Sequence, residues 1–227
     1  MRKPVVRIVL VLSVLTVAGI VALAAGGHHG IVTSQDGRLS IATNGPSHVT
    51  PANMEPESDL KIIAGNLSQY PYGVYFCCYG YTISGPDSFL GTAYWSAVPF
   101  TPSANYTVER IRASVAWGSN GANGATLSLN ADANGVPGAA LASFDATNLG
   151  TFGDCCLVAV AKTGVPVTAG TQYWVVVSTD ASTDDTFDAW AFNSTGQRSY
   201  PLASYSSSSG VWTAGEGLLP GYRVLGK

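Results

Sequence analysis

The sequence predicts an all-β protein, an antiparallel β-sandwich of jelly-roll-like type with about nine or ten short strands, preceded by an N-terminal signal or anchor helix. Three observations lead to this prediction. Apolar and polar residues alternate along many short segments, turns rich in Gly, Pro and Asn separate these segments, and after the N-terminus no segment shows the 3.6-residue repeat of an amphipathic helix. Strands that bury one face alternate with period two, and many short strands favour a sandwich.

The N-terminal 25 residues are the one segment expected to be helical. Arg2, Lys3 and Arg7 precede an uncharged apolar run over residues 8–25, which ends with small residues. A basic start, a long apolar run and a small-residue exit are typical of a secretory signal. The run of about 18 residues is also just long enough to span a bilayer, so an uncleaved anchor is the alternative. Either reading predicts a secreted or cell-surface protein whose only membrane contact is this segment, if it is retained.

Residues 26–60 are expected to contain a short hairpin and a Pro-rich linker. Two strand-like runs surround Asp36-Gly37 in "IVTSQDGRLSIA", and Asp-Gly between such runs favours a hairpin. The polar stretch "TNGPSHVTPANMEPESD" contains three prolines, which remove backbone donors and favour a linker. We therefore expect the sandwich domain to cover residues 61–227. The hairpin could pair with an exposed sheet edge of a neighbouring copy.

Alternation within residues 61–227 defines the strands and their faces. The segment "RIRASVAW" places apolar side chains on one face and polar ones on the other: Ile111, Ala113, Val115 and Trp117 against Arg110, Arg112 and Ser114. The segment "TLSLNAD" alternates in the same way. The segment "QYWVVVS" is apolar on both faces, which is typical of a central strand covered on each side. The turn signals between strands include "GSNGANG", "ANGVPG" and "KTGVP".

Composition and charge narrow the class of partner. Removal of the basic N-terminus leaves eight basic residues against fourteen acidic ones, a net charge near −6, with no cluster of Lys and Arg. This balance argues against nucleic acid and against an anionic membrane surface. Only 11% of residues are charged, and small polar residues are abundant, as in many exported β-proteins. The remaining length suits one domain with a substantial core.

Four cysteines occur as two adjacent pairs, Cys77-Cys78 and Cys155-Cys156. An even number in an exported chain predicts disulfides. Four cysteines allow three connectivities, and we favour bridges between the pairs, because each would close a loop of about 78 residues and contribute on the order of 4 kcal/mol. Adjacent residues on a flat strand point to opposite faces, so this pairing requires a bend at each pair. The spacing does not match zinc or redox motifs.

The order of several segments resembles one bacterial group. The segments "YFCCYGYTISGP", "PFTPSANYTVERI", "LSLNADANGVPGAAL", "GDCCLVAV", "VTAGTQYWVVV", "FDAWAFNSTG" and "GYRVLG" follow one another. Together they resemble the exported choice-of-anchor domain proteins, in which one β-sandwich precedes varied surface-sorting tails, often of the PEP-CTERM type. The resemblance covers about residues 61–226 and implies an exported sandwich. The sequence departs from the group after "YRVLG", where no sorting motif follows. No site residue is implied.

Catalytic motifs are not found in the sequence. His28, His29 and His48 fall outside the expected sandwich, so a serine or cysteine nucleophile lacks a positioned base. A glycosidase needs two carboxylates facing one another across a cleft. Candidates are numerous, and the sequence does not select a pair: Glu109, Asp132, Asp145, Asp154, Asp180, Asp184, Asp185, Asp188 and Glu216. We therefore assign no catalytic residue and expect no enzyme, with a glycoside-acting hydrolase as an alternative.

Structural calcium is the only cofactor that the sequence suggests. The segment "STDDTFDAW" and an aspartate just before it gather four carboxylates: Asp180, Asp184, Asp185 and Asp188. Calcium takes six to eight oxygen ligands, which such a loop could supply together with backbone carbonyls; a solvated acidic loop is the alternative. The segment "NADANG" begins like an EF-hand loop but has Asn130 at its first position and Leu141 at its twelfth. We interpret it as a hairpin turn.

Aromatic side chains are the strongest candidates for a binding site. Tyr and Trp rings stack on sugar faces in many sugar-binding sandwiches, although aromatic residues also favour strands and cores. The candidate ligand-binding residues are Tyr72, Tyr75, Tyr79, Tyr81, Trp95, Trp190 and Trp212. We expect a secreted or surface-attached module that is structural or adhesive, with carbohydrate binding as the alternative. Its expected partners are extracellular polysaccharide or other envelope and matrix proteins.

Overall fold

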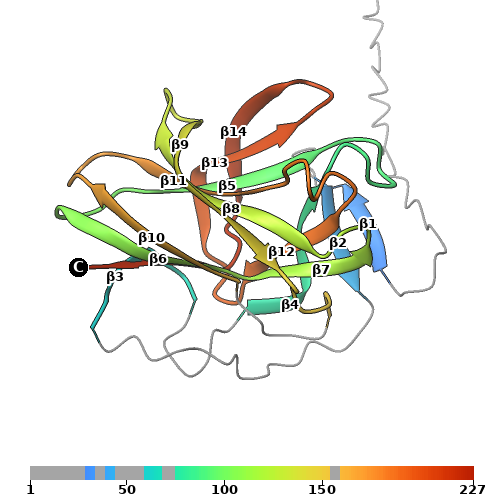
Figure 1. Ribbon diagram of the computed structural model, residues 1–227, viewed down its shortest axis with the longest axis horizontal. Coiled ribbons are helices and arrows are strands. Elements are labelled where there is room, and N and C mark those ends of the chain that lie inside the picture. Colours follow the sequence, from blue (N-terminus) through green and yellow to red (C-terminus); the bar gives the residue numbers. More distant parts are fainter. Residues whose placement is uncertain (1–28, 34–38, 44–58, 68–74, 154–158) are drawn as a thin grey trace, which may run out of the picture.

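The computed structural model describes residues 29–33, 39–43, 59–67, 75–153 and 159–227, and these residues form fifteen strands and no helix. The strands form two antiparallel sheets that pack face to face, which confirms the predicted all-β sandwich class (Figure 1). The expected N-terminal helix lies outside the described residues. Within them, no helix has the length and apolarity needed to cross a membrane.

The larger sheet has eleven strands, and its longest path runs β1-β2-β4-β5-β11-β8-β9. Strand β12 pairs with β4 and with β7, and β13 pairs with β5 and with β14. The strands are β1 (His29–Thr33), β2 (Leu39–Thr43), β4 (Tyr75–Ser84), β5 (Tyr94–Phe100), β7 (Val115–Asn120), β8 (Gly124–Asp132), β9 (Pro137–Thr147), β11 (Tyr173–Ser178), β12 (Phe187–Asn193), β13 (Arg198–Ser206) and β14 (Val211–Leu218).

The smaller sheet has the order β10-β6-β15-β3. Its strands are β3 (Lys61–Gly65), β6 (Tyr106–Ala113), β10 (Ala159–Val167) and β15 (Tyr222–Gly226). Within the described residues from Lys61 onward there are thirteen strands, more than the nine or ten expected. One reason is that "RIRASVAW" forms two strands, β6 and β7, in different sheets.

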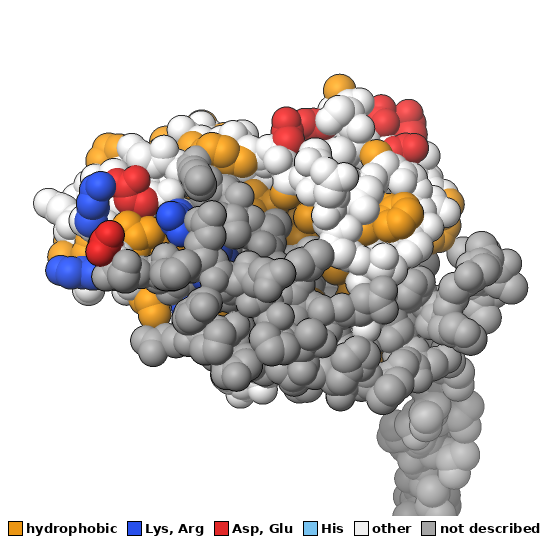
Figure 2. Space-filling model, turned by 60° about the horizontal axis from the view of Figure 1, so that its bottom comes forward, with side chains coloured by type: hydrophobic (Ala, Val, Ile, Leu, Met, Phe, Trp, Pro, Cys, Tyr) orange, Lys and Arg blue, Asp and Glu red, His pale blue; other side chains and the backbone are white. Residues whose placement is uncertain are grey.

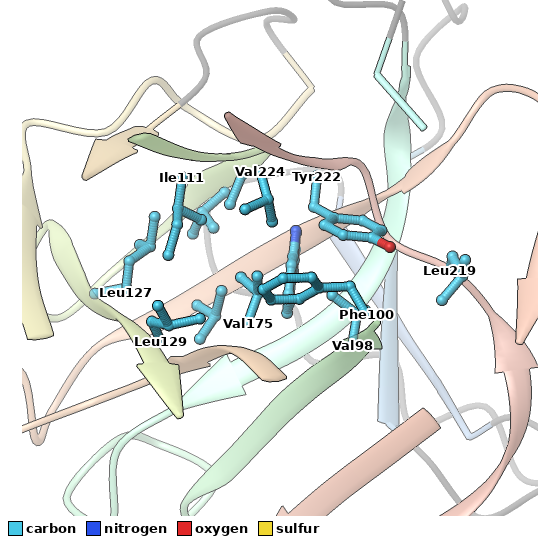
Figure 3. Close-up of a cluster of buried hydrophobic side chains, with 14 of the residues drawn as sticks. Val98, Phe100, Ile111, Leu127, Leu129, Val175, Leu219, Tyr222 and Val224 are labelled. Carbon is cyan, nitrogen blue, oxygen red and sulfur yellow. The ribbon is translucent and has the colours of Figure 1, made fainter. Parts of the chain in front are cut away.

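The hydrophobic core lies between the two sheets and consists of alternate residues from both. Figure 3 shows side chains from the larger sheet facing those from the smaller one: Val98, Phe100, Leu127, Leu129 and Val175 opposite Ile111 and Val224, with Tyr222 and Leu219 beside them. Most of these side chains are completely buried. Since complete burial of an aliphatic side chain contributes roughly 1.5–3 kcal/mol, this set stabilises the contact between the sheets.

Strand β11 lies at the centre of the larger sheet, between β5 and β8, as the apolar run "QYWVVVS" predicts. Val175 and Val177 point into the core, whereas Trp174 and Val176 belong to a second buried cluster on the opposite face. This second cluster also contains Ala97 and Ala203. The larger sheet is therefore covered with apolar contacts on both faces at its centre.

One chain segment crosses from the smaller sheet to the larger at Ser114. Strand β6 ends at Ala113 and β7 begins at Val115, so the chain changes sheets within one residue. The Ser114 amide donates to the Gly221 carbonyl (3.0 Å), and the Ala191 amide donates to the Ser114 carbonyl (2.9 Å). The buried Ser114 hydroxyl is 2.9 Å from the Ala191 carbonyl and 3.1 Å from the Gly221 carbonyl. Strands that change sheets in this way form the corners of sandwiches.

The polar face of β6 is buried at Arg112 and half-buried at Arg110, which differs from the solvated face implied by simple alternation. The side chains of Arg110 and Arg112 do lie opposite the core, as predicted, but Arg112 is only 1% exposed. Arg223 of β15 pairs with Arg112 in register and is 2% exposed. The Arg223 guanidinium donates to the Leu67 carbonyl. The Glu109 carboxylate is 3.3 Å from the Lys227 amine. Alternation predicted which face these residues occupy but not that the face is covered.

The N-terminal hairpin is part of the larger sheet. Strands β1 and β2 pair with each other, while Asp36 and Gly37 between them lie outside the described residues. Strand β2 also pairs with β4, through Ser40 and Tyr81 and the two neighbouring residue pairs. The hairpin thus adds to the sheet of its own chain, although we expected it to precede the sandwich. This pairing gives no support to the idea that it pairs with a neighbouring copy.

The segment "NADANG" forms the β8–β9 hairpin turn, as predicted. Asn134 and Gly135 have φ values of 58° and 85°, which suit a left-handed turn. The Gly135 amide donates to the Asp132 carboxylate (3.1 Å), and the Ala133 amide donates to the Val136 carbonyl (2.8 Å). The turn is stabilised by these bonds within the protein and by its glycine.

We predict that Ser114→Ala lowers the free energy of unfolding by about 1 kcal/mol, because it removes a buried hydroxyl whose hydrogen bonds join three segments at the corner. Urea unfolding followed by tryptophan fluorescence measures this change. Ser143→Ala, at an exposed position on β9, is the control and should have almost no effect. Equal stability of both variants contradicts a role of Ser114 in holding the corner.

Candidate functional site

Three aromatic side chains from three adjacent strands contact one another on the outer face of the larger sheet. Trp95 of β5 stacks on Tyr205 of β13, with ring centroids 4.2 Å apart and planes 14° apart. Trp212 of β14 lies 5.7 Å from Tyr205 and 6.4 Å from Trp95, with tilted planes. All three rings are partly exposed. We call these three residues the aromatic cluster.

Strand register brings the aromatic cluster together. Tyr205 pairs with Trp95 on one side and with Trp212 on the other, so the rings form a ladder across β5, β13 and β14. Directly paired residues on antiparallel strands point to the same face. Since Val98 and Phe100 point into the core, Trp95 points outward by alternation. Trp212 also packs against the buried cluster around Trp174, which fixes the ladder to the sheet.

The same cross-strand line continues beyond Trp95 with polar side chains. Val177 pairs with Ser96, which places Ser178 at the level of Trp95. Ser178 pairs with Thr126, and Thr126 pairs with Asp145. The Thr126 hydroxyl is 3.5 Å from the Asp145 carboxylate. We call the complete line the outer row: Trp212, Tyr205, Trp95, Ser178, Thr126 and Asp145.

The Trp95 ring is held in place by two contacts. Its indole N–H donates to the Thr179 hydroxyl (3.0 Å), and Tyr205 covers one of its faces. Because the two rings are nearly parallel, the other face of Trp95 is directed away from β13, toward the strand that carries Ser178. A ring face beside small hydroxyl side chains can take a ligand that is apolar on one side and hydroxylated on the other.

Two carboxylates lie at the polar end of the outer row. Hydrogen bonds from the Ser182 hydroxyl and amide, followed by one from the Thr183 hydroxyl, lower the pKa of Asp180 despite some desolvation, and the Asp145 side chain lies close by. The Ser182 hydroxyl lies 2.7 Å and its amide 2.8 Å from the Asp180 carboxylate. Asp145 of β9 and Asp180 of the turn after β11 therefore lie together. Both are exposed acceptors for hydrogen bonds.

Charged residues are distributed unevenly between the two sheets. Five of the seven basic residues in the described ranges lie on strands of the smaller sheet: Lys61, Arg110, Arg112, Lys162 and Arg223. Most of the described acidic residues belong to the larger sheet and its loops: Asp87, Asp132, Asp145, Asp180, Asp184, Asp185, Asp188 and Glu216. Figure 2 shows Lys and Arg gathered at one end of the molecule and a separate acidic group along the top. The outer row thus lies on the larger sheet, which carries most of the described acidic residues.

The candidate aromatic residues from the sequence divide into four groups. Trp95 and Trp212 belong to the aromatic cluster. Tyr81 and Trp190 are buried in the core, with the Tyr81 hydroxyl donating to Leu218 and the Trp190 indole to Gly221. Tyr79 is 52% exposed but lies on β4, away from the row. Tyr75 is on β4 with its side chain outside the description, and Tyr72 lies outside the described residues.

Tyr205 is the member of the aromatic cluster that sequence reasoning missed. It lies in "LASYSSSSGVW", seven residues before Trp212 and separated from it by a Ser/Gly turn. A hairpin centred on this turn pairs the two rings, and the structure has that pairing. The spacing of Tyr205 and Trp212 around this turn therefore could have predicted the pair, but only once the turn had been recognised as a hairpin turn.

The four aspartates proposed for calcium occupy different environments. Asp180 caps its own turn through Ser182 and Thr183, and Asp185 accepts from the Ala122 amide (2.9 Å). Asp188 is completely buried on β12. Among the described residues, no three His, Cys, Asp or Glu side chains gather closely enough to hold a metal ion. The structure gives the calcium hypothesis no support.

The carboxylates considered for hydrolysis are also dispersed. Glu216 lies on β14, and its carboxylate is 2.8 Å from the Arg198 guanidinium. Asp132 accepts hydrogen bonds from the Trp174 indole and the Gln172 amide, both at 2.7 Å. These bonds and those from two turn amides outweigh desolvation and lower the pKa of Asp132. Asp145 and Asp180 are the candidates that lie together, while Asp154 is outside the described residues.

The cysteine prediction concerns side chains that the structure does not describe. Cys77 and Cys78 lie on β4, and Cys155 and Cys156 lie outside the described residues. The cross-linked pairing stays a prediction.

Asp188 is a buried carboxylate without a normal hydrogen-bond partner in the described part of the chain. The nearby Thr186 hydroxyl donates instead to the Ala122 carbonyl. Burial raises the pKa of the Asp188 carboxyl well above its ordinary value, and the proximity of Thr186 and of the Gly118 amide offsets only part of this rise. The sequence analysis placed Asp188 in an acidic loop because of its acidic neighbours, whereas strand β12 begins one residue before it.

Comparisons with known proteins assign no family. No family model matches the chain, and a search of curated proteins finds no significant match. The assignment of function therefore depends on the geometry of the outer face.

We predict that Asp188→Asn stabilises the protein at neutral pH. An acid with a raised folded-state pKa binds its proton more tightly in the folded state, so stability is greatest at low pH and falls as pH rises between the two pKa values. Above that window, each unit by which the folded-state pKa is raised lowers the free energy of unfolding by about 1.4 kcal/mol. Unfolding in urea from pH 4 to pH 8 should show a gain for the variant that grows with pH. Asp87→Asn, at an exposed site, is the control; a gain independent of pH contradicts the prediction.

Proposed function

We propose that this chain is an exported, non-catalytic β-sandwich that acts as an adhesive module and contacts extracellular carbohydrate through its aromatic cluster. The observation that carries the proposal is the arrangement of Trp95, Tyr205 and Trp212. They form one partly exposed group of rings, fixed on a rigid sheet and continued by hydroxyl and carboxylate side chains.

The chemistry of sugars fits such a surface. One face of a pyranose ring carries mainly C–H groups and packs on an aromatic face, while its hydroxyls require donors and acceptors at the edge. The face of Trp95 turned away from Tyr205 provides the first contact. Ser178, Thr126 and Asp145 provide the second, since hydroxyls both donate and accept and a carboxylate accepts from two donors.

An adhesive role without turnover is favoured by what surrounds the rings. The described carboxylates near the aromatic cluster are Asp145 and Asp180, which lie on the same side of it and within hydrogen-bonding reach of one another. A glycosidase places its two carboxyl groups about 5–9.5 Å apart on opposite sides of the scissile bond. A pair on one side suits binding of hydroxyl groups better than cleavage.

Two features of the sequence favour an extracellular setting. The basic and apolar N-terminus indicates export, and the order of segments over residues 61–226 resembles exported choice-of-anchor domains. Extracellular polysaccharide, or a glycan-bearing envelope or matrix protein, is the partner that this setting offers. The acidic balance of the chain disfavours nucleic acid.

We predict that the full chain binds a neutral polysaccharide on a glycan array and that Trp95→Ala weakens this binding at least about tenfold, or by about 1.4 kcal/mol. The reason is that the variant removes the ring that lies next to the polar half of the outer row. Trp212→Ala should also weaken binding. Isothermal titration with the polysaccharide identified on the array measures both effects.

Tyr79→Ala is the matched control, because Tyr79 is an exposed aromatic residue on the same sheet but outside the outer row. It should bind like the unaltered chain. Circular dichroism and thermal unfolding verify that each variant is folded. If no glycan binds, or if Tyr79→Ala and Trp95→Ala have equal effects, the proposed function is wrong.

A further inference from the structure

The outer row crosses six adjacent strands almost at right angles to them. Its residues come, in order, from β14, β13, β5, β11, β8 and β9. Neighbouring strands lie about 4.8 Å apart, so the five intervals span roughly 24 Å. A single sugar ring covers only a small part of this line, whereas an extended chain of several units matches it.

The two halves of the outer row have different chemistry. Trp212, Tyr205 and Trp95 present carbon surface, and Tyr205 and Trp95 are nearly parallel. Ser178, Thr126 and Asp145 present small polar groups, with the Thr126 hydroxyl close to the Asp145 carboxylate. A sugar chain that lies along the row can stack at one end and form hydrogen bonds at the other. Neither half alone offers both stacking and hydrogen bonds to more than one sugar unit.

Charge restricts which chains can lie along the row. Asp145 and Asp180 bring two carboxylates to its polar end, and Asp132 is exposed on the same sheet. The only basic residue among the described ones of β13 and β14, Arg198, is 2.8 Å from Glu216. A uronate or sulfate group placed near Asp145 therefore meets a like charge, whereas a hydroxyl or an amine meets an acceptor.

We infer that the outer row binds an internal stretch of a polysaccharide chain that carries no acidic groups, and that the chain lies across the strands. The Trp95 face turned away from Tyr205 stacks on one unit, the ring edges of Tyr205 and Trp212 contact the neighbouring units, and Asp145 with Asp180 excludes acidic polysaccharides. This inference rests on the proposed function and adds the length, direction and charge of the ligand.

Ligand length gives the first test. The full chain is titrated with cello-, xylo- and chito-oligosaccharides, comparing the disaccharide and the hexasaccharide of each series. A hexasaccharide that contacts the whole row should bind at least about tenfold more tightly than the disaccharide. Trp212→Ala, at the far end of the row, should reduce hexasaccharide affinity at least about fivefold and leave disaccharide affinity nearly unchanged. Val211→Ala, on the opposite face of β14, is the control.

Ligand charge gives the second test. An oligogalacturonate hexasaccharide should bind at least about tenfold more weakly than the best neutral hexasaccharide at low salt. Asp145→Asn should reduce this difference in affinity several-fold, because it removes one of the repelling charges. Raised salt should do the same, because screening weakens repulsion between exposed charges. Asp87→Asn removes one exposed acidic charge outside the row and should leave the difference unchanged.

The outcomes separate the two proposals. If hexasaccharide and disaccharide bind equally, or if oligogalacturonate binds as well as neutral chains, the inference is wrong while carbohydrate binding stands. If no oligosaccharide binds and the array is also empty, both are wrong. Length dependence that Trp212→Ala removes, together with a charge preference that Asp145→Asn reduces, supports the inference.

Discussion

The arrangement of this protein depends on one crossing, where the chain leaves the smaller sheet after Ala113 and enters the larger sheet at Val115. Ser114 lies between them and is completely buried. Its amide, carbonyl and hydroxyl all bond to the segments around Ala191 and Gly221. Gly221 has no room for a side chain, since an added Cβ would come within 2.5 Å of the Ser114 hydroxyl. The crossing therefore fixes β12 and β15 relative to one another, and with them the faces of both sheets that enclose the core. Because unpaired buried polar groups are costly, these bonds favour one arrangement of the corner over alternatives.

The outer row is a consequence of that core. A strand has only two faces, so once Val98, Val175 and Leu127 are directed inward, the residues between them are directed outward. On β5 and β11 the outward residues near the centre are also apolar, and they form the second buried cluster around Trp174. Asp132 accepts a hydrogen bond from the Trp174 indole, which allows this large ring to be buried without loss of its polar contact. The aromatic cluster therefore stands on a packed base and not on a mobile loop.

Local pattern predicted the strands, the two-faced character of β11 and the hairpin turn at Asn134-Gly135. It also included Trp95 and Trp212 among the candidate binding residues, but it could not separate them from Trp190, which is in the core. The difference arises from register between strands far apart in sequence, as when Trp95 pairs with Tyr205. Alternation likewise placed Arg112 opposite the core without showing that it is buried, since burial depends on what packs over the face. Asp188 is a related case: its neighbours in sequence are acidic and polar, whereas its neighbours in space are the strands β4 and β7.

Rigidity decides how well such a row can serve adhesion. Binding usually costs free energy because side chains lose rotamer freedom when a ligand immobilises them. In the aromatic cluster much of that freedom is already lost, since Trp95 is held by Tyr205 and by the Thr179 hydroxyl, and Trp212 packs on the base of the sheet. The polar half consists of Ser and Thr, whose short side chains have little rotamer entropy to lose, and of an aspartate. Each contact is nevertheless modest and open to water, so a single row is expected to bind weakly and to release readily. Adhesion then results from many copies that engage one long chain at the same time, where effective concentration raises the overall affinity without any new contact.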